Sequence, residues 1–425
     1  MWQTLWGHER LWLILSMLSV RAVGFLTSLM ISRWVGPAAL GVYAAVVNVA
    51  GATVGQVAQV MQNNAAIMAG GAGTQRAGLV RAHLLPLLCM VVAALAVFGL
   101  LAPGSGLSSM DAGTTAMVWL AAASVIVAQL AGGVATGLNQ GVGQFVAPAR
   151  AAVLAAGTVV LVSLGLIIQG GLYGGLISLI LNSWATPVIG LLLFLRPGMA
   201  GAQPATVAGD ERDDEPMGPH RVWGALWQSA PAVGTAVLTA GCAWFCGVYL
   251  VNRLHGVAGV GMNAVGIQWS TIMLVPATSW AGIVFKRLMD AQADPQAVMR
   301  KVHLGLIGRN LLVTAALALT VAACGSLIAG LYKLPAVQLW PVLMAMGCYA
   351  MLVSINGVTE RLLYVRGQQF PWLLITLCGC LVQVGTCLVM LPRGLYGQGL
   401  GLAASELSIL ILSWFFVYGR SCTRS

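Results

Sequence analysis

The sequence predicts an all-α polytopic membrane protein with about 12 transmembrane helices in two parallel six-helix halves. First, 59% of the 425 residues are apolar and only 8% are charged, whereas about 25% of a soluble domain is charged. Second, apolar runs follow one another from Leu11 to Tyr418, and each crossing of a bilayer needs about 20 such residues. Third, the chain resembles itself at one constant offset, which pairs Gly36 with Gly256 and indicates an internal repeat. Disorder is excluded, and a soluble enzyme is not expected.

The apolar runs are continuous, which favours helices over the alternating segments of about 10 residues that form β-barrels. The stretch Gly198–Arg221 holds five of the 11 acidic residues and is expected to be a solvated loop. The sequence therefore divides into an N-terminal six-helix bundle at 1–195, a cytoplasmic acidic linker at 196–222 and a C-terminal six-helix bundle at 223–425. The expected spans are 11–32, 40–61, 83–102, 114–137, 146–168, 171–195, 223–250, 262–284, 305–331, 336–357, 370–391 and 395–418.

The basic residues predict the orientation, because cytoplasmic loops of membrane proteins are enriched in Lys and Arg. With the N-terminus inside, 14 of the 21 basic residues fall in inner segments and three fall within spans. The four in outer loops are Arg33, Arg253, Lys333 and Arg393. We therefore expect a multi-pass protein of the cell inner membrane with both termini in the cytoplasm.

The internal repeat is clearest around the turn between the first two spans. The segments 33–44 and 253–264 share five identities, among them Gly36 with Gly256 and Gly41 with Gly261. Each half is expected to contain a helix, a tight outer turn that depends on glycine, and a second helix. Because each half has an even number of spans, the repeat is parallel, and a substrate site is expected near the midplane between the halves.

The same turn carries a family resemblance. The first span is followed by Arg33-x-x-Gly36-Pro37-x-x-x-Gly41-Val42-Tyr43-Ala44, which resembles the first two helices of the polysaccharide transporter family. That family includes the O-antigen flippases and belongs to the multidrug/oligosaccharidyl-lipid/polysaccharide (MOP) exporter superfamily. The resemblance implies a flippase that moves an undecaprenyl-diphosphate-linked oligosaccharide across the inner membrane by alternating access. It also implies membrane lipids and a polysaccharide polymerase or chain-length regulator as partners.

Three arginines within spans are candidates for binding an anionic substrate, because a charge in the bilayer core normally faces a cavity or a partner. Arg21 lies about ten residues into the first span, about 15 Å deep at 1.5 Å per residue. It either binds a diphosphate or an acidic sugar, or it pairs within the helix bundle. Arg150 and Arg309 lie about one turn from the cytoplasmic ends of their spans. They either line the substrate path or extend to lipid phosphate.

Polar residues within the second and last spans complete the candidate site. Asn48, Gln56, Gln59 and Asn63 are spaced to lie near one helical face, where they bind sugar hydroxyls or hydrogen-bond to other helices. Glu406 is expected to be the one acid deep in a span. It serves as a charge partner for Arg21 or Arg309, or it takes part in ion coupling.

The sequence contains no pattern of catalytic residues, so we expect a transporter and not an enzyme. No pair of cysteines has histidines at zinc spacing, and no nucleotide-binding glycine loop is present; we expect no metal, no cofactor and no nucleic-acid partner. Two alternatives to the flippase remain open. One is a cation-coupled multidrug exporter of the same superfamily, and the other is a non-transporting partner of the polysaccharide assembly machinery.

Overall fold

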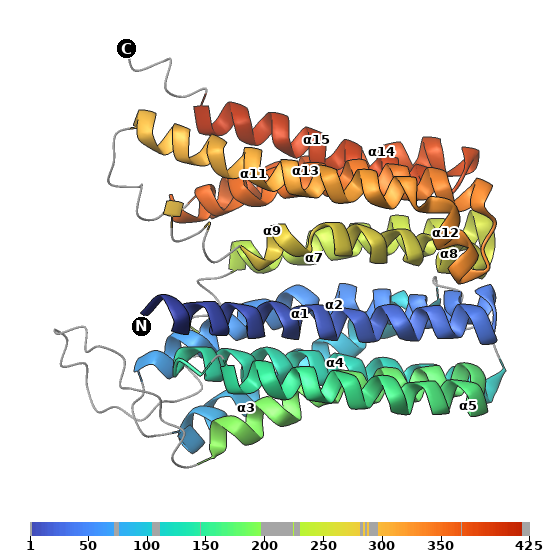
Figure 1. The fold of residues 1–425 in the computed structure, drawn as a ribbon, viewed down its shortest axis with the longest axis horizontal. Helices are drawn as coiled ribbons and strands as arrows, with labels where there is room; N and C mark the ends of the chain where they lie inside the picture. The colour runs from blue at the N-terminus through green and yellow to red at the C-terminus, as the bar shows by residue number, and fades with distance from the viewer. Residues whose placement is uncertain are drawn as a thin grey trace. The chain divides into compact units, whose positions relative to one another are not determined.

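The computed structural model describes residues 2–71, 76–103, 111–144, 146–196, 224, 230–280, 284, 287–288, 296–366 and 368–418. These residues are helical apart from short turns and contain no strand (Figure 1). Eight helices within them are long and apolar enough to cross a membrane. The predicted all-α polytopic fold class is confirmed.

The helices follow the predicted spans closely, with differences at a few ends. Gly171 (φ 55°, ψ −125°) breaks α5 between the two spans expected there. α13 continues to Val365, past its expected end at 357. In chain order the elements are α1 (Trp2–Trp34), α2 (Pro37–Gly71), α3 (Arg76–Leu101), α4 (Ala112–Gly141), α5 (Val146–Leu195), α7 (Ala230–Trp244), the π-helix η2 (Phe245–Leu250), α8 (Val251–Met273), α9 (Val275–Ser279), α11 (Gln296–Ala323), α12 (Gly325–Tyr332), α13 (Ala336–Val365), α14 (Gln369–Met390), the 3₁₀-helix η4 (Leu391–Arg393) and α15 (Tyr396–Tyr418).

The chain packs into two compact units. Unit 1 comprises Met1–Trp34 and Val46–Val233, and unit 2 comprises Val35–Ala45 and Gly234–Ser425. The division places the first turns of α2 with unit 2 and the remainder of that helix with unit 1. The predicted linker, residues 196–222, lies outside the described residues apart from Arg196, so the predicted domain boundaries stay a prediction.

Unit 1 is built on direct contact between the backbones of α2 and α4. Gly133, Gly137 and Gly141 of α4 follow one another at a spacing of four and therefore share one helical face. A Cβ added at any of them would overlap a backbone carbonyl oxygen of α2, at Ala58, Gln62 and Ala66 respectively. Helices in lipid associate through such close packing of small residues. α1 and α4 in turn pack along α5 (Figure 1).

Unit 2 places α13 and α14 against α15, and α11 against α13 (Figure 1). Glycines again allow the approach: a Cβ at Gly399 of α15 would lie 2.7 Å from the Cβ of Ala345 in α13. A Cβ at Gly379 of α14 would lie 2.6 Å from a side-chain carbon of Ile409 in α15. Glycine contacts therefore bring the helices of unit 2 close together at several points.

The repeated turn has the conformation that the sequence predicts. Gly36 has φ +116° and Gly256, its counterpart in the second half, has φ +69°. Residues with a Cβ rarely adopt such angles, so glycine is required at both places. The helix–turn–helix unit is thus used twice.

We expect Gly137→Leu to destabilise unit 1, because the larger side chain must push α4 away from the α2 backbone. Overpacking of this kind costs about 1–3 kcal/mol. Thermal unfolding of the detergent-solubilised protein, followed by fluorescence-detected size exclusion, measures the loss. Gly157→Leu is the matched control, because Gly157 is exposed on α5 with no atom within 4 Å of an added Cβ. Equal losses for both variants would contradict the contact.

Candidate functional site

Arg21, the sharpest candidate for binding an anion, lies on α1 in unit 1 and is half-buried. Between Glu9 and Asp210 the sequence contains one acidic residue, Asp111. Asp111 caps the N-terminus of α4 and accepts a hydrogen bond from the Thr114 backbone nitrogen at 2.9 Å. Hydrogen bonds from the Thr114 side chain and backbone lower the pKa of Asp111. The spans of unit 1 therefore carry net positive charge, with Arg21 in the middle third of its helix.

Arg150 and Arg309 are both exposed, the first at the start of α5 in unit 1 and the second on α11 in unit 2. The guanidinium carbon of Arg150 lies 5.1 Å from the ring centroid of Trp12, within cation–π range. Both long side chains can reach a lipid headgroup from these positions. Their proposed contact with substrate stays a prediction.

The amide-rich part of α2 serves helix packing at least in part. Asn48 is half-buried, and the side chains of Gln56, Gln59 and Asn63 lie outside the described residues. Their neighbour Gln62 donates from Nε2 to Oε1 of Gln140 in α4 at 3.0 Å. Thus one amide of this stretch joins α2 to α4, directly beside the glycine contact. The assignment of the other four to sugar binding remains a prediction.

Glu406, in α15 of unit 2, has an amide partner that the sequence did not reveal. Asn356 of α13 donates from Nδ2 to Glu406 Oε2 at 2.6 Å and to the Glu406 backbone oxygen at 2.7 Å. Asn356 is 3% exposed. Hydrogen bonds to a charged group are shorter and stronger than neutral ones, so this bond orients the carboxylate and joins α13 to α15.

A second acid of unit 2 also lies within a helix. α13 extends to Val365 and includes Glu360 near its C-terminal end. The expectation that Glu406 is the one acid deep in a span stays a prediction. Trp372 donates a hydrogen bond to the Glu360 side chain, and the adjacent Arg361 carries the opposite charge. Polar residues at the end of an apolar run resemble a loop in sequence, which is why this span was expected to end at 357.

The repeat places a buried histidine at the same position of each unit. His83 in α3 is 1% exposed, and His303, its repeat counterpart in α11, is fully buried. His83 Nδ1 lies 2.8 Å from the Leu79 backbone oxygen. His303 lies between the Tyr418 hydroxyl at 2.6 Å and Thr359 Oγ1 at 3.3 Å. His303 therefore joins α11 to α13 and to the end of α15, whereas the hydrogen bond of His83 to Leu79 stays within α3.

A polar cluster surrounds the π-helical turn of unit 2. Asn263 of α8 donates from Nδ2 to the Gly247 backbone oxygen at 3.1 Å. Cys387 of α14 donates to Gln398 Oε1 at 3.3 Å. Within the described part of the chain, Asn263 Oδ1 has no hydrogen-bond partner. π-turns are frequent at functional sites. Here the Gly247 backbone oxygen within the turn accepts a hydrogen bond from the Asn263 side-chain amide.

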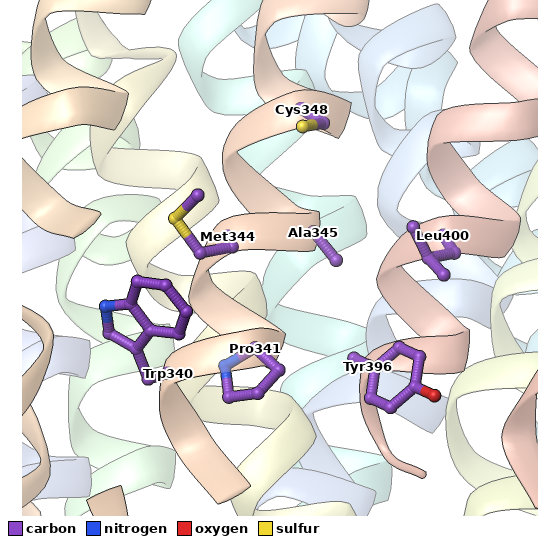
Figure 2. A pocket seen from close by; sticks show the side chains of 7 residues that line it. All are labelled: Trp340, Pro341, Met344, Ala345, Cys348, Tyr396 and Leu400. Carbon is purple, nitrogen blue, oxygen red and sulfur yellow. The ribbon is translucent and has the colours of Figure 1, made fainter. Parts of the chain in front are cut away.

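An apolar pocket of about 320 Å³ lies between α13 and α15 (Figure 2). None of the predicted site residues lines it. Its shape and chemistry suit hydrocarbon and not a sugar or a diphosphate. Its lining consists of Trp340, Pro341, Met344, Ala345, Cys348, Tyr396 and Leu400.

No family model and no curated protein matches the chain. Solved structures do match over nearly its whole length. An inward-facing multidrug resistance MATE family transporter of the MOP superfamily aligns with TM-score 0.68 and 14% identity, covering 97% of this chain and 100% of its own. An outward-facing one aligns with TM-score 0.64 and 16% identity, covering 98% and 96%. A MOP superfamily transporter from Pyrococcus furiosus aligns with TM-score 0.67 and 16% identity, covering 98% and 95%.

At these identities the likeness shows the fold alone. The chain has the fold of MOP-superfamily transporters, and the predicted arrangement of about 12 helices in two six-helix halves is confirmed. The comparisons establish this fold and no more. A shared fold does not determine the substrate or the subfamily, because one fold serves many functions.

We expect Asn356→Leu to destabilise unit 2 by about 1–3 kcal/mol, because it leaves the buried Glu406 carboxylate without its amide donor. Thermal unfolding in detergent measures the loss. Adding Glu406→Leu to Asn356→Leu is expected to restore part of the stability, since removing both partners of a buried hydrogen bond costs less than removing one. A double variant less stable by the sum of the two single losses would contradict the interaction.

Proposed function

We propose that this protein is a flippase that moves an undecaprenyl-diphosphate-linked oligosaccharide across the cell inner membrane by alternating access. The cargo is an O-antigen or another surface polysaccharide repeat unit. The observation that carries the proposal is Arg21, half-buried in the middle third of α1, in a fold shared with transporters. The resemblance of the Arg33–Ala44 segment to the polysaccharide transporter family supplies the substrate class.

The charge distribution of unit 1 supports an anionic cargo. A charged side chain within the bilayer costs at least about 2.5–3.5 kcal/mol and marks a substrate or ion pathway. The expected spans of this half contain Arg21 and Arg150 but no acidic residue. A guanidinium is suited to a diphosphate, because it can donate two parallel hydrogen bonds to phosphate oxygens. The deep cation at Arg21 thus matches the charged part of a lipid-linked sugar.

The remaining predicted residues take complementary roles in this proposal. Asn48, Gln56, Gln59 and Asn63 bind sugar hydroxyls along α2. Arg150 and Arg309 attract the anionic head at the cytoplasmic ends of their spans, where both chain termini also lie. The polyisoprenoid tail stays in membrane lipid, and a polysaccharide polymerase or chain-length regulator receives the product.

The multidrug exporter is the competing proposal, because two of the aligned structures are multidrug resistance transporters. The Pyrococcus furiosus structure is described as having a binding pocket of reversed polarity that suggests a different function. Pocket charge therefore varies within this fold, and cationic drugs call for acids that the expected spans of the first half lack. Glu406 and Glu360 in unit 2 instead suit coupling to a cation or a proton, with Asn356 orienting Glu406.

Depletion of the protein tests the function directly. We expect an undecaprenyl-diphosphate-linked oligosaccharide to accumulate on the inner leaflet and surface glycan to fall, as measured by mass spectrometry of extracted lipids. Purified protein in liposomes should move a fluorescent lipid-diphosphate oligosaccharide between leaflets. Unchanged glycan together with increased drug susceptibility would favour the exporter, and unchanged lipid movement in liposomes would favour a non-transporting partner.

Arg21→Ala is expected to reduce lipid movement at least tenfold, because one lost charge-assisted contact to phosphate is worth about 1.5–3 kcal/mol. Arg21→Lys should retain part of the activity, since it keeps the charge and loses the paired geometry. Arg253→Gln is the matched control, which removes one positive charge from an exposed residue that donates to Tyr249. Transport that falls equally in Arg253→Gln would count against a specific role for Arg21.

A further inference from the structure

The pocket between α13 and α15 has aromatic walls that neighbouring turns hold in place. The Trp340 indole donates from Nε1 to the Ala322 backbone oxygen at 3.0 Å. Its ring lies against Gly325, where an added Cβ would overlap it. On the other side, the Tyr396 ring lies against the turn at Gly394, where an added Cβ would lie 2.6 Å from a ring carbon. Contacts within unit 2 therefore fix both rings, and the pocket is preformed.

The inside of this pocket is suited to a hydrocarbon chain. Its volume of about 320 Å³ lies within the range of ligand pockets, about 300–1,000 Å³. Its lining contains no charged side chain, and Figure 2 shows the Tyr396 hydroxyl pointing away from Trp340. Met344 is 39% exposed and Cys348 is exposed, so the pocket opens on the surface of unit 2. A chain can therefore enter it from the side.

Positive charge adjoins the pocket at the end of the spans that is predicted to face outward. Two of the four basic residues expected in outer loops flank the helices that form it. Lys333 ends α12 just before α13, and Arg393 lies three residues before Tyr396. Both are exposed, and no acidic residue of the second half falls in an expected outer loop. Basic residues are uncommon in outer loops, so this pair favours an anion beside the apolar pocket.

We propose that this pocket and Arg393 bind a polyisoprenoid diphosphate on the outward side, with one segment of the tail in the pocket and the diphosphate on the arginine. The inference rests on the flippase function proposed above and adds a place where the cargo is held after crossing. The guanidinium can donate two parallel hydrogen bonds to phosphate oxygens. The remainder of the tail stays in membrane lipid. A phospholipid also combines a chain with a phosphate, so the test must separate the two lipids.

Photo-crosslinking of the purified full-length protein in phosphatidylcholine nanodiscs tests the site. The probe is a polyprenyl diphosphate with a diazirine on its tail, and mass spectrometry locates the labelled residues. We expect labelling in the segments 340–348 and 396–400, displaced by excess unlabelled polyprenyl diphosphate and not by phosphatidylglycerol. Labelling spread over the exposed apolar residues of all helices overturns the proposal. So does equal displacement by phosphatidylglycerol, which would identify an ordinary lipid contact.

Met344→Trp is expected to reduce labelling about tenfold, because the larger ring overpacks the space that the tail would take. Cys348→Phe fills the same pocket one helical turn further along α13 and replaces this variant if it fails to fold, as judged by size exclusion. Leu381→Trp is the matched control, because Leu381 is 66% exposed on α14 and does not line the pocket. Unchanged labelling in both pocket variants, or an equal fall in Leu381→Trp, overturns the proposal.

Arg393→Gln tests the phosphate contact and is expected to reduce labelling about tenfold, because charge-assisted hydrogen bonds to the diphosphate are lost. Arg253→Gln is the matched control, since it removes one positive charge from another expected outer loop. A diazirine-bearing polyprenol, which has no phosphate, should label the pocket equally in the parent protein and in Arg393→Gln. An equal fall in Arg253→Gln, or a fall of polyprenol labelling in Arg393→Gln, overturns the phosphate contact.

Labelling measures binding and needs no movement of lipid between leaflets, so its outcome is separable from the proposed function. Pocket labelling in protein that moves no lipid-diphosphate oligosaccharide in liposomes supports the binding site and overturns the flippase. Lipid movement in liposomes without pocket labelling supports the flippase and overturns the binding site.

Discussion

Backbone contact through glycine is the constraint on which this structure depends. Lipid tails are as apolar as the helix surfaces, so hydrophobic burial gives little drive for helices to associate within a bilayer. Attraction must come from close packing, and close packing needs positions without side chains. The α4 glycines against α2 meet this need in unit 1, as Gly399 against Ala345 does in unit 2. The same device at Gly41 and Gly261 attaches the start of α2 to the second unit.

The two repeats share their glycine turns and buried histidines, but they differ in the charged residues within their spans. Gly36, Gly41 and His83 have structural counterparts in the second half, at Gly256, Gly261 and His303. The charges expected deep within spans do not: the counterpart of Arg21 is Gly241, and that of Glu406 is Thr186. The expected spans of the first half thus carry positive charge and no acid, while Glu406, the carboxylate within the expected spans, lies in the second half. An anionic cargo and a coupling cation have opposite charges, so this asymmetry suits binding one in each unit.

The sequence predicted most of the fold because hydropathy and the repeat are both properties of long segments. The glycine turns were found at their correct residues, since a conformation with positive φ leaves a clear requirement for glycine. The spacing of four between the α4 glycines is present in the sequence, but it does not stand out because the chain contains 53 glycines. The hydrogen bond from Asn356 to Glu406 could not be predicted from the sequence, because it joins residues far apart in the chain and leaves no local pattern.

The candidate site was predicted less completely, for a physical reason. A polar residue in a span has the same sequence signature whether it binds substrate or joins two helices, because both roles require burial with a partner. Gln62 shows the second outcome through its bond to Gln140. Charge is more informative, since the expected spans of the first half carry arginines and no carboxylate. The assignment of an anionic cargo therefore depends on the sign and depth of one residue, while the amides around it fit either role.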